Sequence, residues 1–495
     1  MKIFTKEQIK EADRYTVENE PITSIDLMER ASEAIAGWIC KNIDRQIPLL
    51  FIIGKGNNGG DGLAVARILK QKDFNCSIYL AYGKDFPNEE CRINLERLPD
   101  DISFIDNLME IDEQTVIIDA LLGTGISGNV RDPAASVISR INSLNNKVIS
   151  IDLPSGMCIA PPTLPCSHNE TESRQIIKAD ITLSLEFPKL AMMFPEMGEY
   201  AGTIVTLPIG LSKTFLEQTE SPYHYIDQTL INKLKKKRSK FSHKNTYGHA
   251  LLICGSTNMI GAAMLATGAA LRSGCGLVSV HIPYNERIAL QIKFPPAILS
   301  FDKSGHFSEM PNDISKYNAI GIGCGLGTHP ETMRVFEILL KTAKIPLVID
   351  ADALNILAMN KMLLKYIPGN SILTPHLGEL KRLTGEWNSE DNKSRKITNL
   401  SSETKSIIVV KGAHTAIYLP DGNVYFNSTG NAGMAKGGSG DVLTGLITGL
   451  LARGYNSFEA SVLGVYFHGL AGDKACEKYG PESMNSLDLL NLIEN

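Results

Sequence analysis

Short apolar segments that alternate with helical patterns constrain the fold of this chain more than any other feature. The segments 49–53, 116–121 and 148–151 are typical of buried strands, and each continues directly into a polar or glycine-rich loop. The same order resumes in the second half, at 250–254, 276–282, 319–322, 346–350 and 407–410. Strands separated by helices predict an α/β architecture with largely parallel sheets. The carboxyl ends of such strands form the ligand crevice of an open sheet, so these loops are the predicted functional regions.

Length and composition predict a soluble cytoplasmic protein of two or three domains. A chain of 495 residues is too long for one ordinary core. The net charge of -5 argues against nonspecific nucleic-acid binding. No apolar run approaches the ~20 residues of a membrane span, and residues 1–10 are too polar for a signal peptide. The nine cysteines are scattered without a Cys-x-x-Cys pair, which indicates reduced thiols.

A lysine-rich stretch interrupts the strand–helix pattern between about 210 and 246. It contains Lys233, Lys235, Lys236, Lys237, Arg238, Lys240 and Lys244. The stretch could attract phosphate groups, but a solvated linker is the more common role of such charge runs. We therefore predict domains at 1–212 and 247–495, joined by a linker at 213–246.

A glycine-rich run near the C-terminus, 430–441, predicts an anion-binding site. Its backbone N–H groups can converge on an anion, and the helix predicted from Val442 to Arg453 adds the positive end of its dipole. The run is not a P-loop, because it lacks the glycine-lysine-serine/threonine ending. Asp441 stands at the mouth of this site, where a carboxylate would repel a bound phosphate. Asp441 is therefore a candidate base that takes a proton from a hydroxyl group.

The first half contains a weak dinucleotide motif. Residues 54–62 have the G-x-G-x-x-G spacing after a strand and before a helix predicted at 63–70. A dehydrogenase would carry an acid at the end of the second strand, but residues 79–82 contain none and Asp85 lies beyond it. Hydride transfer is therefore doubtful, and the glycines could equally form a tight turn with close helix packing.

Two further loops of the first half add oxygen ligands. Asn58 and Ser155 follow strand ends and Asp119 lies near the end of its strand. Their side-chain oxygens with nearby carbonyl groups suit a hard cation. The alternative is that Asp119 and Ser155 only satisfy N–H groups of the loops.

The first half, roughly residues 1–211, resembles the epimerase domain of NAD(P)H-hydrate repair enzymes. The motifs that carry this resemblance are 55–62 (KGNNGGDG), 119–125 (DALLGTG) and 151–156 (IDLPSG). The resemblance implies a Rossmann-like three-layer α/β/α domain. It implies that K⁺ binds to Asn58, Asp119 and Ser155, and that Asp152 contacts the substrate as the acid/base candidate. The hydrated nucleotide is implied to bind Asn57, Asn58, Gly59, Gly60, Asp61, Gly123, Thr124, Gly125, Ile126, Ser127, Gly128, Asn129 and Asp152. The chain departs from the family after Gly156, where 157–160 and a proline-rich insert to about Glu172 replace an Asp/Asn-rich turn.

The second half, from about 247 to 478, resembles the dehydratase domain of the same system, which is ribokinase-like. The motifs are Tyr247-Gly248-His249, 261–263 (GAA), 323–327 (GCGLG), 350–355 (DADALN), 374–379 (TPHLGE), 411–415 (KGAHT) and the 430–441 run. The resemblance implies that Ala262, Gly325, His376 and Asp441 line the site for the hydrated nucleotide. It implies that the adenine nucleotide is held by Lys411, Gly412, Ala413, His414, Thr415 and Gly440. Purely structural roles are the alternative for a few of these motif residues: His376 as a helix cap, Lys411 as a strand end, and Asp352 and Asn355 as caps. The chain departs from the family at Cys324 and Leu377, each in place of a proline, and at Asn245, in place of a glycine.

Both domains in this order match the bifunctional NAD(P)H-hydrate repair enzymes, and the resemblance implies a lyase and isomerase that repairs a damaged metabolite. The expected reactions are epimerisation of R- and S-NAD(P)HX and dehydration of the S form at the expense of ADP, with release of AMP and phosphate. ATP is the donor in other members, and Mg²⁺ is expected with either nucleotide. We expect a homo-oligomer without nucleic-acid or membrane partners. A ribokinase-like kinase of a vitamin-precursor alcohol and a first half that only binds ligand are the rival interpretations.

Overall fold

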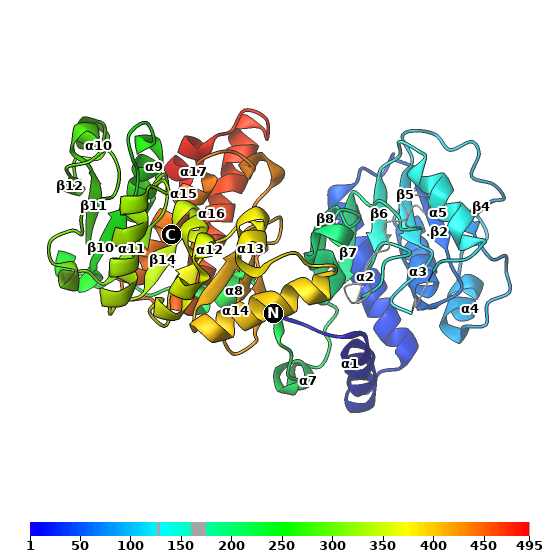
Figure 1. Ribbon diagram of the computed structural model, residues 1–495. Coiled ribbons are helices and arrows are strands. Elements are labelled where there is room, and N and C mark those ends of the chain that lie inside the picture. Colours follow the sequence, from blue (N-terminus) through cyan, green and yellow to red (C-terminus); the bar gives the residue numbers. More distant parts are fainter. Residues whose placement is uncertain (126–128, 160–174, 495) are drawn as a thin grey trace. The chain divides into compact units, whose positions relative to one another are not determined.

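The computed structural model describes residues 1–125, 129–159 and 175–494, and the chain divides into two compact units. The N-terminal unit comprises Lys2–Ser221 and the C-terminal unit comprises Pro222–Asn495. Each is described by itself below. Figure 1 labels their helices and strands.

The N-terminal unit is built on one parallel sheet. Its strands lie in the order β4 (Ser103–Ile105), β3 (Cys76–Leu80), β2 (Leu49–Ile53), β5 (Val116–Ala120), β6 (Val148–Ile151), β7 (Ile181–Leu185) and β8 (Thr203–Leu207). The helices of this unit are α1 (Lys6–Asn19), α2 (Ser24–Asn42), α3 (Asn57–Lys70), α4 (Glu89–Glu96), α5 (Ala134–Asn142), α6 (Pro195–Gly198) and α7 (Lys213–Gln218).

Helices cover both faces of this sheet, which explains its continuously apolar strands. Side chains of a strand alternate between the faces. Phe51 and Ile53 of β2 pack in a core with residues of α2 and α3, whereas Leu50 and Ile52 pack in a second core with residues of α5. The unit is therefore a three-layer α/β/α sandwich.

The C-terminal unit has a longer sheet. Its strands lie in the order β12 (Ile298–Asp302), β11 (Leu277–Pro283), β10 (His249–Ile253), β13 (Ala319–Ile322), β14 (Leu347–Ile349), β15 (Ile372–Leu373), β16 (Ile407–Val410), β17 (Ala416–Tyr418), β18 (Val424–Phe426) and β9 (Tyr223–Tyr225). The strands from β12 to β16 are parallel, and β17 runs antiparallel to β16 and to β18. Its helices are α8 (Gln228–Leu234), α9 (Ile260–Arg272), α10 (Arg287–Lys293), α11 (Pro330–Thr342), α12 (Ala351–Met359), α13 (Leu377–Thr384), α14 (Glu390–Thr404), α15 (Ser439–Ala452), α16 (Ser457–Tyr479) and α17 (Ser486–Leu492).

Both sheets reverse their winding direction near the middle. In the N-terminal unit the chain moves outward from β2 through β3 to β4, then in the opposite direction from β5 to β8. In the C-terminal unit it moves from β10 to β12 and then, in the opposite direction, from β13 to β16. Because right-handed crossovers put the helices of the two directions on opposite faces, a crevice opens at each reversal. The reversals, β2/β5 and β10/β13, are therefore the expected ligand sites.

Two predicted helix starts were wrong. The helix after β2 begins at Asn57 rather than at 63, so the asparagines and glycines of its motif belong to its first turns. The last glycines of the 430–441 run also lie in a helix, because α15 begins at Ser439.

The segment predicted as a linker, 213–246, carries regular structure. It contains α7, β9 and α8, and β9 pairs in parallel with β18. Ile231 of α8 is fully buried in the core of the C-terminal unit. The residues from Pro222 onward therefore belong to the second unit, since their apolar side chains complete its core.

Two simpler predictions concern membranes and thiols. Among the described residues, no helix combines the length and the apolar character that crossing a bilayer requires. The cysteines of the described residues are all free thiols, as predicted from their spacing.

Candidate active sites

A cavity of about 800 Å³ opens in the N-terminal unit at the β2/β5 reversal. Residues at or just after the carboxyl ends of β2, β5, β6 and β7 line this cavity. Other lining residues belong to α1 and α2. Its lining includes Asp13, Met28, Lys55, Asn57, Asn58, Asp61, Gly123, Thr124, Gly125, Asp152, Phe187 and Lys189. The three loops that the sequence singled out therefore converge on one cavity.

Gly59, Gly60 and Asn129, which were also predicted for the nucleotide site, are not among the residues that line this cavity. Gly59 and Gly60 are buried and pack closely, because a Cβ at Gly59 would stand 2.1 Å from the oxygen of Gly54. Asn129 is exposed. Ile126, Ser127 and Gly128 lie outside the described residues, as does most of the proline-rich insert.

The three predicted cation ligands lie together beneath the cavity. Ser155 Oγ is 2.5 Å from Asp119 Oδ1, and the Ser155 N–H donates to Asp119 Oδ2 at 2.9 Å. Asn58 Nδ2 and Ser155 Oγ both donate to the carbonyl oxygen of Leu122, at 3.0 and 3.2 Å. Asp119 and Ser155 are fully buried. The alternative, that these side chains satisfy N–H groups of the loops, also holds. Asp119 accepts a hydrogen bond from the N–H of Leu121, and Ser155 accepts one from the N–H of Leu122.

Asp119 is a buried carboxylate whose partners are all neutral donors. Burial raises its pKa, although hydrogen bonds from Ser155, Ser150 and Leu121 counteract the shift. Within the described parts of the chain, no lysine, arginine or histidine forms an ion pair with it. A bound cation would supply the missing positive charge, so this donor set fits a hard cation such as K⁺.

Asp152 begins the loop after β6 and is held by a lysine that the sequence analysis missed. Its φ of 65° is unusual for a residue with a side chain. Asp152 Oδ1 accepts from Lys189 Nζ at 2.5 Å and from the N–H of Leu185 at 3.0 Å. Lys189 is 1 % exposed, and its ammonium group also donates to Ser184, Leu185 and Phe187. Its position just after a parallel strand, β7, was a usable signal.

Two more carboxyl groups face the same cavity. Burial and the neighbouring Asp152 raise the pKa of Asp13 to about 6, with Lys189 opposing the shift. The pKa of Asp61 is raised well above its usual range, mainly by burial and further by the negative charges of Asp152 and Asp13. The cavity thus holds three carboxyl groups and one buried ammonium group, and the raised pKa values of Asp13 and Asp61 let them bind protons at a higher pH than free carboxyl groups do. Asp13 was missed, although it interrupts the apolar face of α1 between Ile9 and Val17.

The glycine loops of the C-terminal unit meet at the β10/β13 reversal. The N–H of Gly255, after β10, donates to the oxygen of Cys324, after β13, at 2.7 Å. Ser256 Oγ donates to the oxygen of Gly325 at 2.8 Å. A Cβ at Gly325 would stand 2.9 Å from the Cβ of Ala262, so these two predicted site residues are in contact. Asp352 accepts from the N–H of Gly327 at 2.8 Å and thus holds the loop rather than capping α12.

Asp441 lies in the first turn of α15. Its helix begins after Gly438, which has φ of 90°, and a Cβ there would stand 2.5 Å from Leu265. Burial raises the pKa of Asp441 to about 6, with a hydrogen bond from the Cys324 thiol and the charge of Lys411 opposing the shift and Asp350 and Asp352 adding to it. A carboxyl group with this pKa is ionised at neutral pH and can still accept a proton efficiently.

Lys411 directly follows β16, and its ammonium group lies beside the start of α15. Its Nζ is 2.8 Å from Oδ1 of Asp350, whose Oδ2 accepts from Thr444 of α15 at 2.7 Å. A Cβ at Gly440 would stand 3.3 Å from Lys411 Nζ, so the predicted pair Lys411 and Gly440 lies together. Burial would lower the pKa of Lys411, but the charges of Asp350 and Glu379 outweigh it and raise the value. Lys411 is therefore a permanent cation beside the helix N-terminus.

The remaining predicted residues occupy two neighbouring turns. Gly412, Ala413, His414 and Thr415 form the turn between β16 and β17, where Thr415 Oγ1 donates to the oxygen of Gly412 at 3.1 Å. His376 caps α13, and its Nδ1 accepts from the N–H of Gly378 at 3.0 Å. Its Nε2 lies 3.2 Å from Glu379, which in turn lies 3.8 Å from Lys411. The cap interpretation of His376 is thus correct, and the ring remains 54 % exposed beside the Lys411 group.

Three residues around Asp441 were not predicted as site residues. Asp350 is 1 % exposed and anchors Lys411. His468 of α16 is buried, and its Nε2 lies 2.9 Å from the oxygen of Ser439. Burial lowers the pKa of His468 to about 4, so it is neutral. Cys324, which stands where the family has a proline, places its thiol against Asp441.

Comparisons with known proteins agree with this arrangement. The family described as "NAD(P)H-hydrate dehydratase" matches residues 250–495, and the family described as "YjeF-related protein N-terminus" matches residues 24–191. The bifunctional NAD(P)H-hydrate repair enzyme Nnr of Moorella thermoacetica is 31 % identical over 525 aligned positions, covering 100 % of this chain and 96 % of that protein. The chain belongs to the bifunctional NAD(P)H-hydrate repair enzyme family. The α/β class and the Rossmann-like and ribokinase-like domains predicted from the sequence are confirmed.

Other members of the family align equally completely. The bifunctional NAD(P)H-hydrate repair enzyme Nnr of Coxiella burnetii is 31 % identical and covers 98 % of this chain and 97 % of that protein. Among solved structures, the ADP/ATP-dependent NAD(P)H-hydrate dehydratase from Bacillus subtilis, co-crystallised with ATP/Mg²⁺, is 31 % identical. It covers 55 % of this chain and 96 % of its own, with a TM-score of 0.48.

Proposed function

We propose that this chain repairs hydrated NADH and NADPH in two steps, at two separate sites. The N-terminal unit interconverts the R and S hydrates, and the C-terminal unit dehydrates the S hydrate at the expense of ADP, releasing AMP and phosphate. The observation that carries this proposal is the full-length match to bifunctional repair enzymes, with each half retaining its own set of charged residues. The limits 1–212 and 247–495 stay a prediction for the two functional domains, whereas the compact units of the fold are Lys2–Ser221 and Pro222–Asn495.

In the epimerase, Asp13 and Asp152 divide the proton transfers. The hydrate carries a hydroxyl group on the carbon beside the ring nitrogen. Protonated Asp13 donates to that hydroxyl, and water leaves as the nitrogen lone pair forms a C=N bond. Ionised Asp152, held by Lys189, then takes a proton from a water molecule that adds to the opposite face. Acid–base assistance of this kind contributes ~10²–10⁴-fold.

K⁺ is the cation we assign to Asn58, Asp119 and Ser155. When bound, it would neutralise Asp119 and hold the loops after β2, β5 and β6 in their positions. The neutral donors around Asp119 support this assignment.

In the dehydratase, Asp441 is the base. It takes the proton of the hydrate's hydroxyl group, whose oxygen attacks the terminal phosphorus of ADP while the bond to AMP breaks. Loss of phosphate, together with a proton from the adjacent ring carbon, then restores the double bond. Phosphorylation is needed because hydroxide is a poor leaving group. The backbone N–H groups of residues 437–440 and the ammonium group of Lys411 stabilise the charge on the transferring phosphoryl group.

The adenine nucleotide binds in this proposal at 411–415 and Gly440, with the hydrated nucleotide at Ala262, Gly325, His376 and Asp441. ADP is the proposed donor and ATP the alternative. Mg²⁺ would accompany the phosphates and neutralise part of their charge.

Turnover of hydrated NADH tests the proposal. Purified protein is incubated with a mixture of the R and S hydrates and K⁺, with ADP, ATP or neither, and both epimers are followed by chromatography. We expect complete conversion to NADH with ADP and only epimerisation without a nucleotide. The rival small-molecule kinase would leave both hydrates unchanged and would phosphorylate hydroxymethylpyrimidine, which serves as the control substrate.

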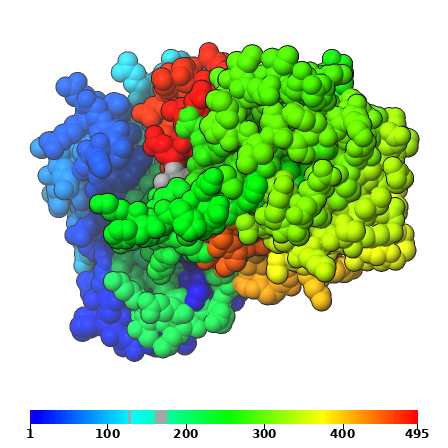
Figure 2. Space-filling view, turned by 90° about the vertical axis from the view of Figure 1, so that its left-hand side faces the viewer, coloured from blue at the N-terminus to red at the C-terminus, as the bar shows by residue number. Residues whose placement is uncertain are grey.

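We also propose a homo-oligomer in the cytoplasm. Exposed apolar side chains occur on α10, at Ile288 and Ile292, and on the edge strand β12, at Ile298 and Phe301. Figure 2 turns this green face of the C-terminal unit toward the viewer. Exposed apolar patches and open strand edges favour self-association. Light scattering of wild type and Ile292→Asp tests this proposal, and an unchanged mass would contradict it.

A further inference from the structure

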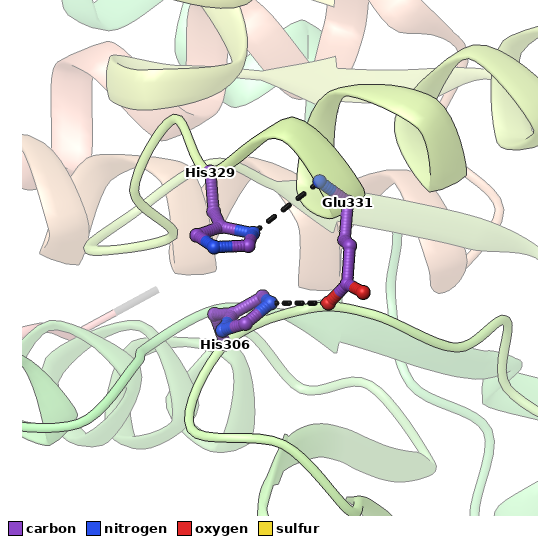
Figure 3. A group of neighbouring side chains, drawn as sticks. All are labelled: His306, His329 and Glu331. Atoms are coloured by element: carbon purple, nitrogen blue, oxygen red, sulfur yellow. Dashed lines mark hydrogen bonds and ion pairs between the residues drawn. The ribbon is translucent and has the colours of Figure 1, made fainter.

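Three side chains outside both active sites lie together between the loop after β12 and the start of α11. His306 belongs to that loop, His329 is the N-cap of α11, and Glu331 lies in its first turn. Figure 3 shows the two imidazole rings one above the other, each with a ring nitrogen turned toward Glu331. His306 Nε2 is 2.9 Å from Glu331 Oε2, and the ring centroids are 3.9 Å apart. One ligand atom of each residue lies within 4.8 Å of the others.

Hydrogen bonds on both sides hold this cluster in place. The oxygen of Gly305 accepts from the N–H of Thr257 at 2.7 Å. Phe307 is 2 % exposed, and its oxygen accepts from the hydroxyl group of fully buried Thr332 at 2.9 Å. These bonds flank His306 on the loop and Glu331 on the helix. The backbone positions of the cluster are therefore fixed by the fold itself.

We propose that His306, His329 and Glu331 form a site for Zn²⁺, with a water molecule as the fourth ligand. Two imidazoles and one carboxylate are a common donor set for this ion, and the absence of a thiolate among the three disfavours softer metals. Bonds of about 2.0–2.2 Å in a tetrahedral site put ligand atoms roughly 3.3 Å apart. The 2.9 Å contact is close to that value, and the partly exposed side chains can rotate by the remaining distance.

Binding replaces two contacts of the metal-free cluster. His329 Nδ1 now accepts from the N–H of Glu331 at 3.3 Å, and the same lone pair would bind the ion. The freed N–H is one of the first in its helix, so it has no intrahelical acceptor and turns to water. His306 binds the ion through Nε2 in the neutral tautomer that carries its proton on Nδ1. Protons compete with the ion for the ring nitrogens, so Zn²⁺ binding weakens at low pH.

Competition with a chromophoric chelator tests this site on the full-length, tag-free protein. We expect the wild type to bind one Zn²⁺ at this site. His329→Ala and Glu331→Gln each weaken binding by at least ~100-fold, since even the loss of an outer partner costs 10–100-fold. His243→Ala is the matched control, because His243 is also an exposed histidine that caps a helical turn. It retains wild-type affinity.

Thermal unfolding gives the second readout. Without metal, all variants should unfold within a few degrees of the wild type, because the substituted side chains lie at the surface. Added Zn²⁺ should raise the midpoint of the wild type and of His243→Ala, but not of the two site variants. Equal Zn²⁺ affinity in all four proteins, or equal stabilisation of all four, would overturn the proposal.

Discussion

The two active sites occupy the same position in similarly wound sheets, yet their charges are arranged for different tasks. In the N-terminal unit, Asp13, Asp61 and Asp152 share a cavity with the buried Lys189, and burial together with the charge of Asp152 raises the pKa of Asp13 and of Asp61. In the C-terminal unit, Lys411 and the start of α15 flank Asp441, so an anion can be held beside a base. One winding pattern thus supports proton transfer in one unit and phosphoryl transfer in the other, because the loops after the strands differ.

The strongest way to separate the two sites is Asp441→Asn. Removing the base should lower dehydration of the S hydrate by ~10³–10⁴-fold, near the upper range for acid–base catalysis. Epimerisation should continue at the wild-type rate. ADP-dependent recovery of absorbance at the NADH band measures the first activity, and chromatography of the epimers measures the second. Recovery of NADH at a rate near that of the wild type would show that Asp441 is not the base.

The reciprocal variant is Asp152→Asn. It should slow epimerisation by ~10²–10³-fold, because the water that adds to the ring loses its base. Pure S hydrate should still be dehydrated normally, whereas a mixed sample should stall at its R fraction. Complete consumption of the mixture at the wild-type rate, after correction for spontaneous epimerisation, would contradict the assignment.

Lys189→Met tests whether the lysine controls the carboxyl groups around it. Removing one partner of a buried ion pair leaves Asp152 uncompensated, so the free energy of unfolding should fall by ~3 kcal/mol. Denaturant unfolding of the wild type, Lys189→Met and Lys178→Met measures this, with Lys178 as an exposed control lysine. Epimerase activity of Lys189→Met should fall, whereas its dehydratase activity should persist under conditions in which the variant remains folded. Equal stability of all three proteins would show that the pair contributes little.

The pH dependence of the two activities should differ in sign. Asp13 acts as an acid with its pKa raised to about 6, so epimerisation should decline as the pH rises through 6. Asp441, the proposed base, has its pKa raised to about 6, so dehydration should increase through the same range and then level off. Rate profiles from pH 5 to 8 on each pure hydrate measure both, and Asp13→Asn should abolish the epimerase decline. Parallel profiles would refute this division of roles.

The smallest expected effect concerns Cys324. Its thiol lowers the pKa of Asp441 through a hydrogen bond, so Cys324→Ala should move the dehydration profile slightly toward higher pH. The epimerase profile should not move. An unchanged pH profile of dehydration in Cys324→Ala would show that the thiol does not affect the pKa of Asp441.

Local patterns predicted the strands well and the helix starts poorly. Strands at 148–151, 319–322 and 407–410 match the structure because continuous apolar runs leave few alternatives. The glycines of 56–62 were interpreted as loop because glycine is a poor helix former. Tertiary packing outweighs that preference, since Gly62 lies against Ala120 where no side chain fits.

The site residues show the same limit. Asn58, Asp119 and Ser155 were found because each lies near or just after a strand end in a recognisable motif. Asp13 and Lys189 reach the cavity from α1 and from the loop after β7, and no short motif connects them to it. Their roles depend on burial and on neighbouring charges, which the order of residues in the chain does not reveal.

Complementation between the single variants tests the central claim most directly. Asp152→Asn and Asp441→Asn are mixed, with K⁺, ADP and both hydrates supplied, and NADH formation is followed to completion. If the two sites act separately on a diffusing substrate, the mixture should convert both epimers fully, whereas the double variant should convert neither. A mixture that stalls with the R hydrate remaining would contradict two independent sites on one chain.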